Sequence, residues 1–378
     1  MTTTSFESHI KSPEKTPLRQ HAWRLLRGSI YLILEAYAIG VLVFSLFVLI
    51  DRTNMAVVEI LKTGFWVGLW TVIPVLLLTL ILHFWRISAL LTLPTLMLGA
   101  YYVPILLPDS IAPPATDARK VIVMTYNLLA GADKADVMDE TVQIMIDSDA
   151  DIIAMQELTR RAIEVFEVSE DLLALYPYHY FHPEQGNPRN AASGQGIFSK
   201  YPIVEDNFWI YDEDIIPILV IAPGYVRRVS HGHQRSVIDV NGQLIVIYNT
   251  HPFPPFQWLG GITFEYFDEE DYSHRTSIQD MVERAHSETL PTVLLGDFNM
   301  SEQFTEYGWV TDHFTDSFRE SGQGMGFTYP AGGFGLLPEL IRLDYIFHNH
   351  ALRSIDTRVL DSDSPSDHLP VIATLLVE

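Results

Sequence analysis

The pattern of apolar and polar positions divides the chain into an apolar N-terminal part and a longer part in which short apolar runs alternate with polar ones. Three apolar runs in the N-terminal part have about the 20 residues that a helix needs to cross a bilayer. These runs cover residues 30–50, 65–84 and 87–107. Because only two residues separate the second run from the third, we expect these two to form an antiparallel hairpin. The pattern predicts three transmembrane helices within residues 29–107.

Basic residues predict the direction in which these helices cross, because cytoplasmic segments of membrane proteins are enriched in lysine and arginine. Arg86 marks the tip of the expected hairpin, whereas Arg52 and Lys62 follow the first run. Five more basic residues precede the first run: Lys11, Lys15, Arg19, Arg24 and Arg27. The distribution predicts a multi-pass protein of the cell (inner) membrane. Its N-terminus, residues 1–28, would be cytoplasmic, and everything after residue 107 would be extracytoplasmic.

The rest of the chain begins with residues 108–119, a stretch rich in proline and small residues that is typical of a stiff linker. Residues 120–378 then alternate strand-like and helical patterns, and Asn241-Gly242 between two apolar runs is typical of a β-hairpin. The expected strands are 121–127, 151–158, 194–205, 234–240, 243–251, 292–299, 342–349, 352–360 and 371–377, and the expected helices are 138–148, 160–176 and 273–287. This mixture predicts an α/β domain built on a sheet.

The charge and cysteine content narrow the range of partners. The formal net charge is −23, and the acidic excess lies after residue 115. Proteins that bind nucleic acids draw most of their affinity from basic groups that neutralise phosphates, so this balance argues against a nucleic-acid partner. The chain has no cysteine, which excludes disulfides and thiolate metal ligands. No protein partner can be inferred.

Polar residues able to bind a metal or a phosphate stand at six expected strand ends. A single such residue is typical of a solvated strand end, but six of this selection predict a common site at one edge of the sheet. Oxygen and imidazole donors without cysteine favour a hard cation such as Mg²⁺ or Mn²⁺. The residues are Asn127, Glu157, Asn249 with His251, Asp297 with Asn299, Asp344, and Asp367 with His368.

The ordered series TYN, QE, NTH, GDFN, LDYIF and SDH, spread over residues 119–378, resembles the endonuclease/exonuclease/phosphatase superfamily. This superfamily includes pancreatic-type deoxyribonucleases, abasic-site endonucleases, neutral sphingomyelinases and inositol polyphosphate 5-phosphatases. The stretch SGQGIFSKYPI also resembles one of its strands. The resemblance implies a two-sheet α/β sandwich and a divalent-metal-dependent hydrolase of phosphoester bonds.

The resemblance also implies which residues hold the metal. Glu157 would be the chief ligand, helped by Asn127 and Asp367. Some members of the superfamily have an aspartate two residues after the asparagine, where this chain has Leu129. Any metal contact from that position would therefore be lost here.

The remaining matched residues would carry out the chemistry. Asp297 would orient or deprotonate the attacking water, and Asn299 would contact the phosphate. His251 and His368 would donate hydrogen bonds to phosphate oxygens, and Asp344 would hold the second imidazole in its productive tautomer. These roles suit phosphoester hydrolysis, which needs a base for the water and donors for the developing negative charge.

Further polar residues carry weaker signals. Asn249 and Arg235 are candidate substrate-binding residues, although an arginine at the start of a strand is also typical of a protein surface. Two histidine pairs have a spacing that occurs in zinc sites but is more often incidental on a strand. They are His231 with His233 and His348 with His350.

The segment 252–267 is rich in aromatic residues and directly follows His251. It is either a lip that touches lipid headgroups or a loop that packs on its own domain. Glu35, inside the first apolar run, is close enough to the cytoplasmic end for its carboxylate to reach the membrane interface.

Three membrane spans followed by this domain also resemble the VanJ-type bacterial membrane proteins. The resemblance implies a membrane-anchored phosphatase or phosphodiesterase whose partners are the lipid bilayer and a membrane lipid or lipid-linked phosphate or pyrophosphate. The alternatives are a membrane-anchored endonuclease or exonuclease using the same residues, and a non-catalytic binding module. The complete set of motifs favours an enzyme.

Overall fold

The contacts within the chain divide it into two compact units, one of Met1–Asp51 with Gly68–Gly99 and one of Arg52–Val67 with Ala100–Glu378. The first unit is helical, and the second contains the α/β domain. The computed structural model describes residues 18–51, 53, 55–106, 119–128, 135–182, 194–210, 219–222, 225–227, 232–255, 264–333, 338–360 and 365–377. The expected linker therefore falls almost entirely outside the described residues.

Apolar helices form the N-terminal part of the chain. They are α1 (Leu18–Ile50), α2 (Ala56–Gly68), the short 3₁₀ helix η1 (Leu69–Thr71), α3 (Val72–Ile81), α4 (Trp85–Leu90) and α5 (Thr92–Leu106). Within the described residues, two continuous helical segments are long and apolar enough to cross a membrane, Gln20–Ile50 and Val57–Ile81. The third expected span is interrupted at Leu91, which separates α4 from α5. Since neither helix has 18 residues, a third crossing stays a prediction.

Within the first unit, α1 runs antiparallel to α3. Tyr37 and Thr71 share a hydrogen bond of 2.7 Å between their hydroxyl groups. At the other end of the pair, Arg27 donates to the carbonyl of Leu82 and lies 5.4 Å over the ring of Phe84. Glu35 of α1 also forms an ion pair of 3.4 Å with Arg86 of α4. The acidic residue inside the first apolar run is thus bound to the basic residue at the expected hairpin tip.

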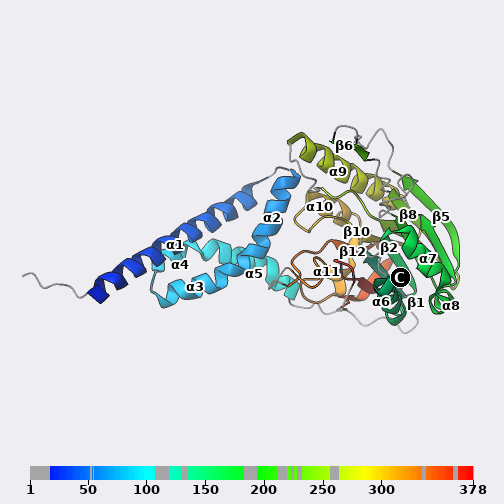
Figure 1. Ribbon diagram of the computed structural model, residues 1–378, viewed down its shortest axis with the longest axis horizontal. Helices are drawn as coiled ribbons and strands as arrows, with labels where there is room; N and C mark the ends of the chain where they lie inside the picture. Colours follow the sequence, from blue (N-terminus) through cyan, green and yellow to red (C-terminus); the bar gives the residue numbers. More distant parts are fainter. Residues whose placement is uncertain are drawn as a thin grey trace, which may run out of the picture. The chain divides into compact units, whose positions relative to one another are not determined.

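The α/β domain is a sandwich of two six-stranded sheets (Figure 1). The first sheet has the order β13-β14-β1-β2-β4-β3 and the second β11-β12-β10-β9-β8-β5. The first contains β1 (Arg119–Asn127), β2 (Ile152–Leu158), β3 (Tyr178–His182), β4 (Gly194–Ser199), β13 (Leu352–Val359) and β14 (Val371–Val377). The second contains β5 (Ile203–Ile210), β8 (Gly232–Val240), β9 (Gln243–Thr250), β10 (Thr292–Asp297), β11 (Thr315–Asp316) and β12 (Asp344–His348). A separate pair is formed by β6 (Leu219–Ala222) and β7 (Tyr225–Arg227).

Three apolar layers hold the sandwich together. Aliphatic residues such as Val123, Ile247 and Leu295 fill the space between the sheets. On the outer face of the first sheet, α6, α7 and α8 pack on a layer that includes Phe166. On the outer face of the second, α9 and α10 pack on a layer that includes Phe347, and Figure 1 shows these helices on opposite sides of the strands. The helices are α6 (Ala135–Asp147), α7 (Arg160–Val168), α8 (Glu170–Leu175), α9 (Phe264–His286), α10 (Thr305–Thr311) and α11 (Ser317–Ser321).

Most of the expected elements are confirmed. The hairpin at Asn241-Gly242 joins β8 to β9, and both turn residues have the positive φ that this turn requires. Two helices differ from expectation. The helix expected at 160–176 is broken by Ser169, whose extended backbone ends α7 and begins α8. The helix expected at 273–287 starts nine residues earlier, at Phe264.

The strand directions bring the polar strand ends to one edge of the sandwich. β1 and β2 are parallel, as are β9 and β10, so all four strands end at that edge. β14 is antiparallel to β1, and β12 is antiparallel to β10, so both of these strands begin there. In the second sheet, Asp297 at the end of β10 is paired directly with Asp344 at the start of β12. The expected meeting of the strand ends is confirmed.

Two buried histidines make the stability of the domain depend on pH. Burial lowers the pKa of His233 and of His274 to about 4. Each is held as a neutral ring: the first bonds the hydroxyl of Thr250 and the carbonyl of Ser277, and the second bonds the carbonyl of Phe253. A histidine has a pKa of about 6.5 in an unfolded chain. These rings therefore stabilise the fold above pH 6.5, and their contribution is lost as pH falls towards 4.

We expect the free energy of unfolding to fall between pH 6.5 and 4.5, by up to about 1.4 kcal/mol per pH unit for each histidine. Denaturant unfolding of the His233→Gln variant should show a shallower slope against pH than the wild type, whatever its stability at pH 7.5. Equal slopes for the two proteins would contradict this account.

Candidate active site

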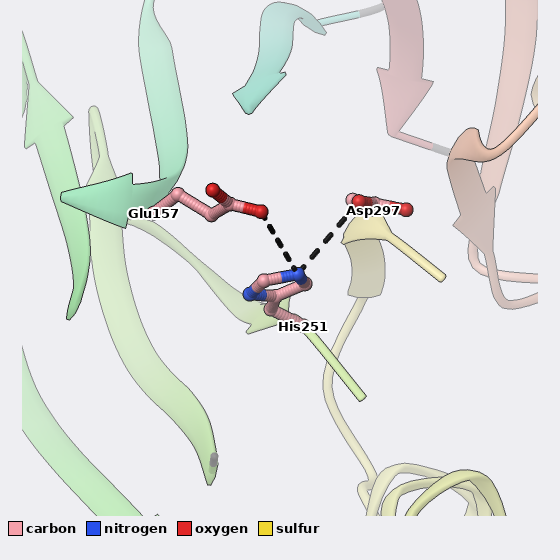
Figure 2. A group of neighbouring side chains, drawn as sticks. All are labelled: Glu157, His251 and Asp297. Carbon is pink, nitrogen blue, oxygen red and sulfur yellow. Dashed lines mark ion pairs between the residues drawn. The ribbon is translucent and has the colours of Figure 1, made fainter. Parts of the chain in front are cut away.

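Residues from both sheets meet at the edge where the strands end. Figure 2 shows the imidazole of His251 between the carboxylates of Glu157 and Asp297. Its Nε2 lies 3.7 Å from Oε1 of the first and 3.7 Å from Oδ2 of the second. The side-chain amide of Asn127 donates to the same two carboxylates, at 3.2 and 2.9 Å. The cluster thus joins β1 and β2 of one sheet to β9 and β10 of the other.

An irregularity in β2 aims Glu157 at the cluster. The register between β2 and β4 shifts between Met155 and Leu158, and Glu157 has a φ of 56°. Holding a residue other than glycine in this left-handed region costs roughly 1–3 kcal/mol of conformational energy, which favourable contacts with the surrounding structure must offset. Because of the bulge, the consecutive side chains of Gln156 and Glu157 point into different parts of the domain. Gln156 bonds Asn249 between the sheets, while Glu157 reaches the edge.

The glycine of the GDFN motif is required by a close approach of two strands. A Cβ at Gly296 would lie 1.9 Å from the carbonyl oxygen of Thr250. Glycine therefore lets β10 lie close to β9 at this point. This approach brings Asp297 next to His251, the residue that follows Thr250.

Asp297 is an enclosed carboxylate of the cluster, with 1% of its surface exposed. Burial raises its pKa, and the imidazoles of His368 and His251 offset part of that increase. Its Oδ1 accepts the backbone N–H of Asn299, and its Oδ2 lies 3.8 Å from Nε2 of His368. A carboxylate with a raised pKa accepts a proton from water more readily at neutral pH.

His368 is held by an acidic partner. Its Nδ1 bonds Oδ2 of Asp344 at 2.8 Å, as the sequence predicts. Burial by itself would lower the pKa of His368, but the carboxylates of Asp344 and Asp297 raise it to about 10. The ring therefore carries a positive charge at neutral pH, and its Nε2–H is a donor directed at the cluster.

The donor set fits a divalent cation. The carboxylates of Glu157, Asp297, Asp344 and Asp367 gather around two imidazoles, which leaves an excess of negative charge at a largely buried edge. Among the described residues no donor forms a hydrogen bond with the buried Oδ1 of Asp344 or of Asp367. Uncompensated buried carboxylates are costly unless they are paired or coordinate a metal. Burial also raises the pKa of Asp367, and the charge of Glu157 adds to this effect.

The structure does not bring every predicted residue to the cluster. Arg235, predicted to bind substrate, has its guanidinium bound to Glu288 and Glu205 on the outer side of the second sheet. Its outward position follows from the alternation of side chains along β8. Asn249, the other predicted substrate ligand, is fully buried and its amide donates to the carbonyls of Met155 and Gly196. It links the sheets beneath the site and is not open to a substrate.

Two residues differ from expectation in finer detail, and others had no predicted role. Asn127 presents its NH₂ group to the carboxylates, whereas a metal ligand would present its amide oxygen. Asn299 has a φ of 52° and donates its amide to the carbonyl of Pro252. Ser366 accepts the backbone N–H of His368 and donates to the carbonyl of Asn127, so it ties the Asp-His segment to β1. Its position two residues before the histidine is a recognisable turn signal.

Other sequence signals have ordinary structural explanations or lie outside the described residues. His233 and His348 are buried and bonded within the protein, the latter to Glu320 at 2.8 Å. His231 and Leu129 lie outside the described residues. In the aromatic segment, residues 256–263 are not described, and Phe253 is buried. The expected lip or packed loop therefore lies largely outside the described residues.

Comparison with known proteins identifies the class. The sequence model of the Endonuclease/Exonuclease/phosphatase family matches residues 124–368, more than half of the chain, and the chain belongs to this family. With the site described above, membership makes the protein a metal-dependent phosphoester hydrolase. No curated protein sequence is significantly similar to the chain.

Solved structures share the fold. An endonuclease/exonuclease/phosphatase from Beutenbergia cavernae is 20% identical, with a TM-score of 0.54 over 68% of this chain and 72% of that one. One from Bacteroides vulgatus is 18% identical, with a TM-score of 0.51 over 69% of this chain and 100% of that one. TDP2 from C. elegans is 17% identical, with a TM-score of 0.51 over 69% of this chain and 77% of that one.

We expect Asp297→Asn to lower kcat by about 10²–10⁴-fold, the usual contribution of a general base, because the amide cannot take a proton from water. The measurement is steady-state hydrolysis of bis(p-nitrophenyl) phosphate by the full-length protein in detergent. Asp312→Asn, which changes an exposed carboxylate of the same domain, is the matched control and should retain wild-type activity. Retention of more than a tenth of wild-type kcat in Asp297→Asn would contradict the assigned role.

Proposed function

We propose that the protein is a membrane-anchored phosphoesterase that hydrolyses a phosphoester or pyrophosphate of a membrane lipid or lipid-linked molecule, with its catalytic domain on the extracytoplasmic side. The observation that carries this proposal is the presence, on one chain, of a cluster of acidic and histidine side chains suited to hold a metal ion and of two apolar helices long enough to cross a bilayer.

The catalytic residues have separate tasks. Glu157 and Asp367 would hold the metal, for which Mg²⁺ or Mn²⁺ suits the oxygen donors. When bound, such a cation neutralises anionic phosphate oxygens and stabilises the charge of the transition state. Asp297 orients the attacking water and takes its proton. The protonated His368, held by Asp344, donates to a phosphate oxygen as negative charge develops.

His251 and Asn299 complete the site. The Nε2 atom of His251 lies between Glu157 and Asp297, so the ring can donate to either carboxylate or to a phosphate oxygen placed between them. The backbone N–H of Asn299 donates a hydrogen bond to the carboxylate of Asp297, and this bond fixes the orientation of the group that takes the proton from water. Both residues therefore limit the positions that a phosphate can take at the cluster.

Contacts of the apolar helices support the proposed topology. The predicted hairpin tip at Arg86 is bound to Glu35 of α1, which agrees with a common, cytoplasmic side for both. Residues 56–67 of α2 and residues 100–106 of α5 belong to the same compact unit as the catalytic domain. Trp66, Tyr101 and Tyr102 lie together there, as aromatic residues commonly do at a membrane interface.

Two observations favour a lipid over a nucleic acid as the substrate. Anchoring to the bilayer raises the local concentration of any substrate that shares the same membrane. The domain is strongly acidic, and Arg235, the arginine predicted to clamp a phosphate, is already paired with Glu288 and Glu205. A nuclease using the same cluster would lack this arginine as a backbone contact.

The test compares substrates in one assay. Full-length protein in detergent is incubated with a polyprenyl pyrophosphate, a phospholipid or single-stranded DNA, in the presence of Mg²⁺ or of EDTA. We expect Mg²⁺-dependent cleavage of a lipid substrate that EDTA and Asp297→Asn both abolish, because the cluster needs its cation and its base.

Cleavage of DNA with no cleavage of either lipid would overturn the lipid assignment and favour an anchored nuclease. Hydrolysis that persists in Asp297→Asn would instead point to a contaminating enzyme or to a different site. The two failures are thus distinguishable.

A further inference from the structure

The loop that follows the catalytic aspartate is held by the apolar helices within the second unit. This loop, residues 298–304, connects Asp297 at the end of β10 to α10. Thr63 of α2 shares a hydrogen bond of 2.5 Å with Ser301. The Cα atoms of residues two positions apart in a chain are at most about 7 Å from each other, so Ser301 lies within that distance of Asn299. The α2 helix therefore reaches the immediate neighbourhood of the catalytic site.

Glu59 makes the strongest of these contacts. Only 1% of its surface is exposed, and its Oε1 accepts both the backbone N–H and the hydroxyl of Thr305, at 2.9 and 2.5 Å. Its other oxygen lies 3.6 Å from the guanidinium of Arg275, which also pairs with the buried Glu306 at 3.1 Å. Charge-assisted hydrogen bonds of this kind are stronger than neutral ones and have stricter geometry. They fix the point at which the loop enters α10.

Tyr101 of α5 holds the middle of the same loop. Its hydroxyl donates to Glu302 at 3.0 Å and accepts from the amide of Gln303 at 2.7 Å. Glu302 in turn pairs with Arg342 at 2.5 Å. Arg342 lies two residues before Asp344, the partner of the catalytic imidazole. Tyr101 is therefore connected to the loop after Asp297 and, through Glu302 and Arg342, to β12, whose Asp344 bonds His368.

This arrangement does not form a ligand site. The cavity between these residues, lined by Thr63, Trp66, Tyr101, Glu302 and Arg342 among others, has a volume of about 40 Å³. That is room for a few water molecules and not for a phospholipid or a nucleotide. The contacts instead constrain a loop that contains a residue in the left-handed conformation, since Asn299 has a φ of 52°.

We propose that Glu59 and Tyr101 are positioning residues for catalysis. Through them, the ends of α2 and α5 hold the loop 298–304 so that Asp297 and Asn299 keep their places in the cluster. Neither side chain touches the reacting atoms. The proposal rests on the hydrolase activity of the family and not on a lipid substrate, so it holds for any phosphoester that the site accepts.

The test measures kcat and KM of the full-length protein in detergent with soluble bis(p-nitrophenyl) phosphate, together with the melting temperature. Glu59→Ala should lower kcat by about 10- to 100-fold, the effect of a misplacement of about 1 Å, with a much smaller change in KM. Glu59→Gln should recover most of the activity, because its amide oxygen can accept the same hydrogen bonds from Thr305. Tyr101→Phe removes a single hydroxyl, remains folded, and should lower kcat in the same way by a smaller factor.

Glu288→Ala is the matched control, since it also removes a carboxylate paired with an arginine in this domain but does not contact the loop. It should lower the melting temperature and leave kcat within about twofold of wild type, as for a site distant from the reaction. The proposal is overturned if Glu59→Ala and Tyr101→Phe lower only the melting temperature, or if Glu288→Ala lowers kcat as much as they do. Since the substrate is soluble, failure of the lipid assignment would leave this comparison intact.

Discussion

The amide of Asn127 makes the contact on which the site depends, because it bonds carboxylates that come from different sheets. Glu157 ends a strand of the first sheet and Asp297 ends a strand of the second, so their separation is set by the packing of the whole sandwich. Two carboxylates this close repel each other unless donors and cations lie between them. A buried amide and two imidazoles supply part of that compensation, and a divalent cation is suited to supply the rest.

The same requirement explains several local features that would be unfavourable elsewhere. Glu157 adopts a left-handed backbone at a bulge because a regular strand would not aim its carboxylate at Asp297. Gly296 has no side chain because the carbonyl of Thr250 occupies that space. Strain of this kind persists only where neighbouring structure fixes it. Here the closely packed strands and the helical contacts of the loop after Asp297 provide that support.

Much of the site could be predicted from the sequence, because polar residues at the ends of apolar strands converge once the strand directions are known. Asn127, Glu157, His251, Asp297 and His368 all lie at the predicted edge. The position of Arg235 could not be predicted, since its charge does not indicate which face of the second sheet it occupies. Asn249 has the right place in the chain, but its burial depends on Gln156 of the other sheet.

Two features of the N-terminal helices could not be predicted from sequence patterns. Hydropathy counts apolar residues and does not detect the interruption at Leu91 that divides the third expected span. The role of Glu59 depends on Thr305, which lies 246 positions away in the chain, so no local pattern indicates it. Long-range polar contacts of this kind become visible only when the fold places both partners.

Direct measurement of metal binding tests whether the edge of the sandwich is a divalent-cation site organised by Glu157, without any assumption about the substrate. Isothermal titration of the full-length protein with Mn²⁺ or Mg²⁺, compared with Glu157→Gln, should show a dissociation constant raised by at least about 10-fold in the variant, because a charged ligand is lost. Equal affinity in both proteins would contradict the account and place the cation elsewhere on this acidic domain.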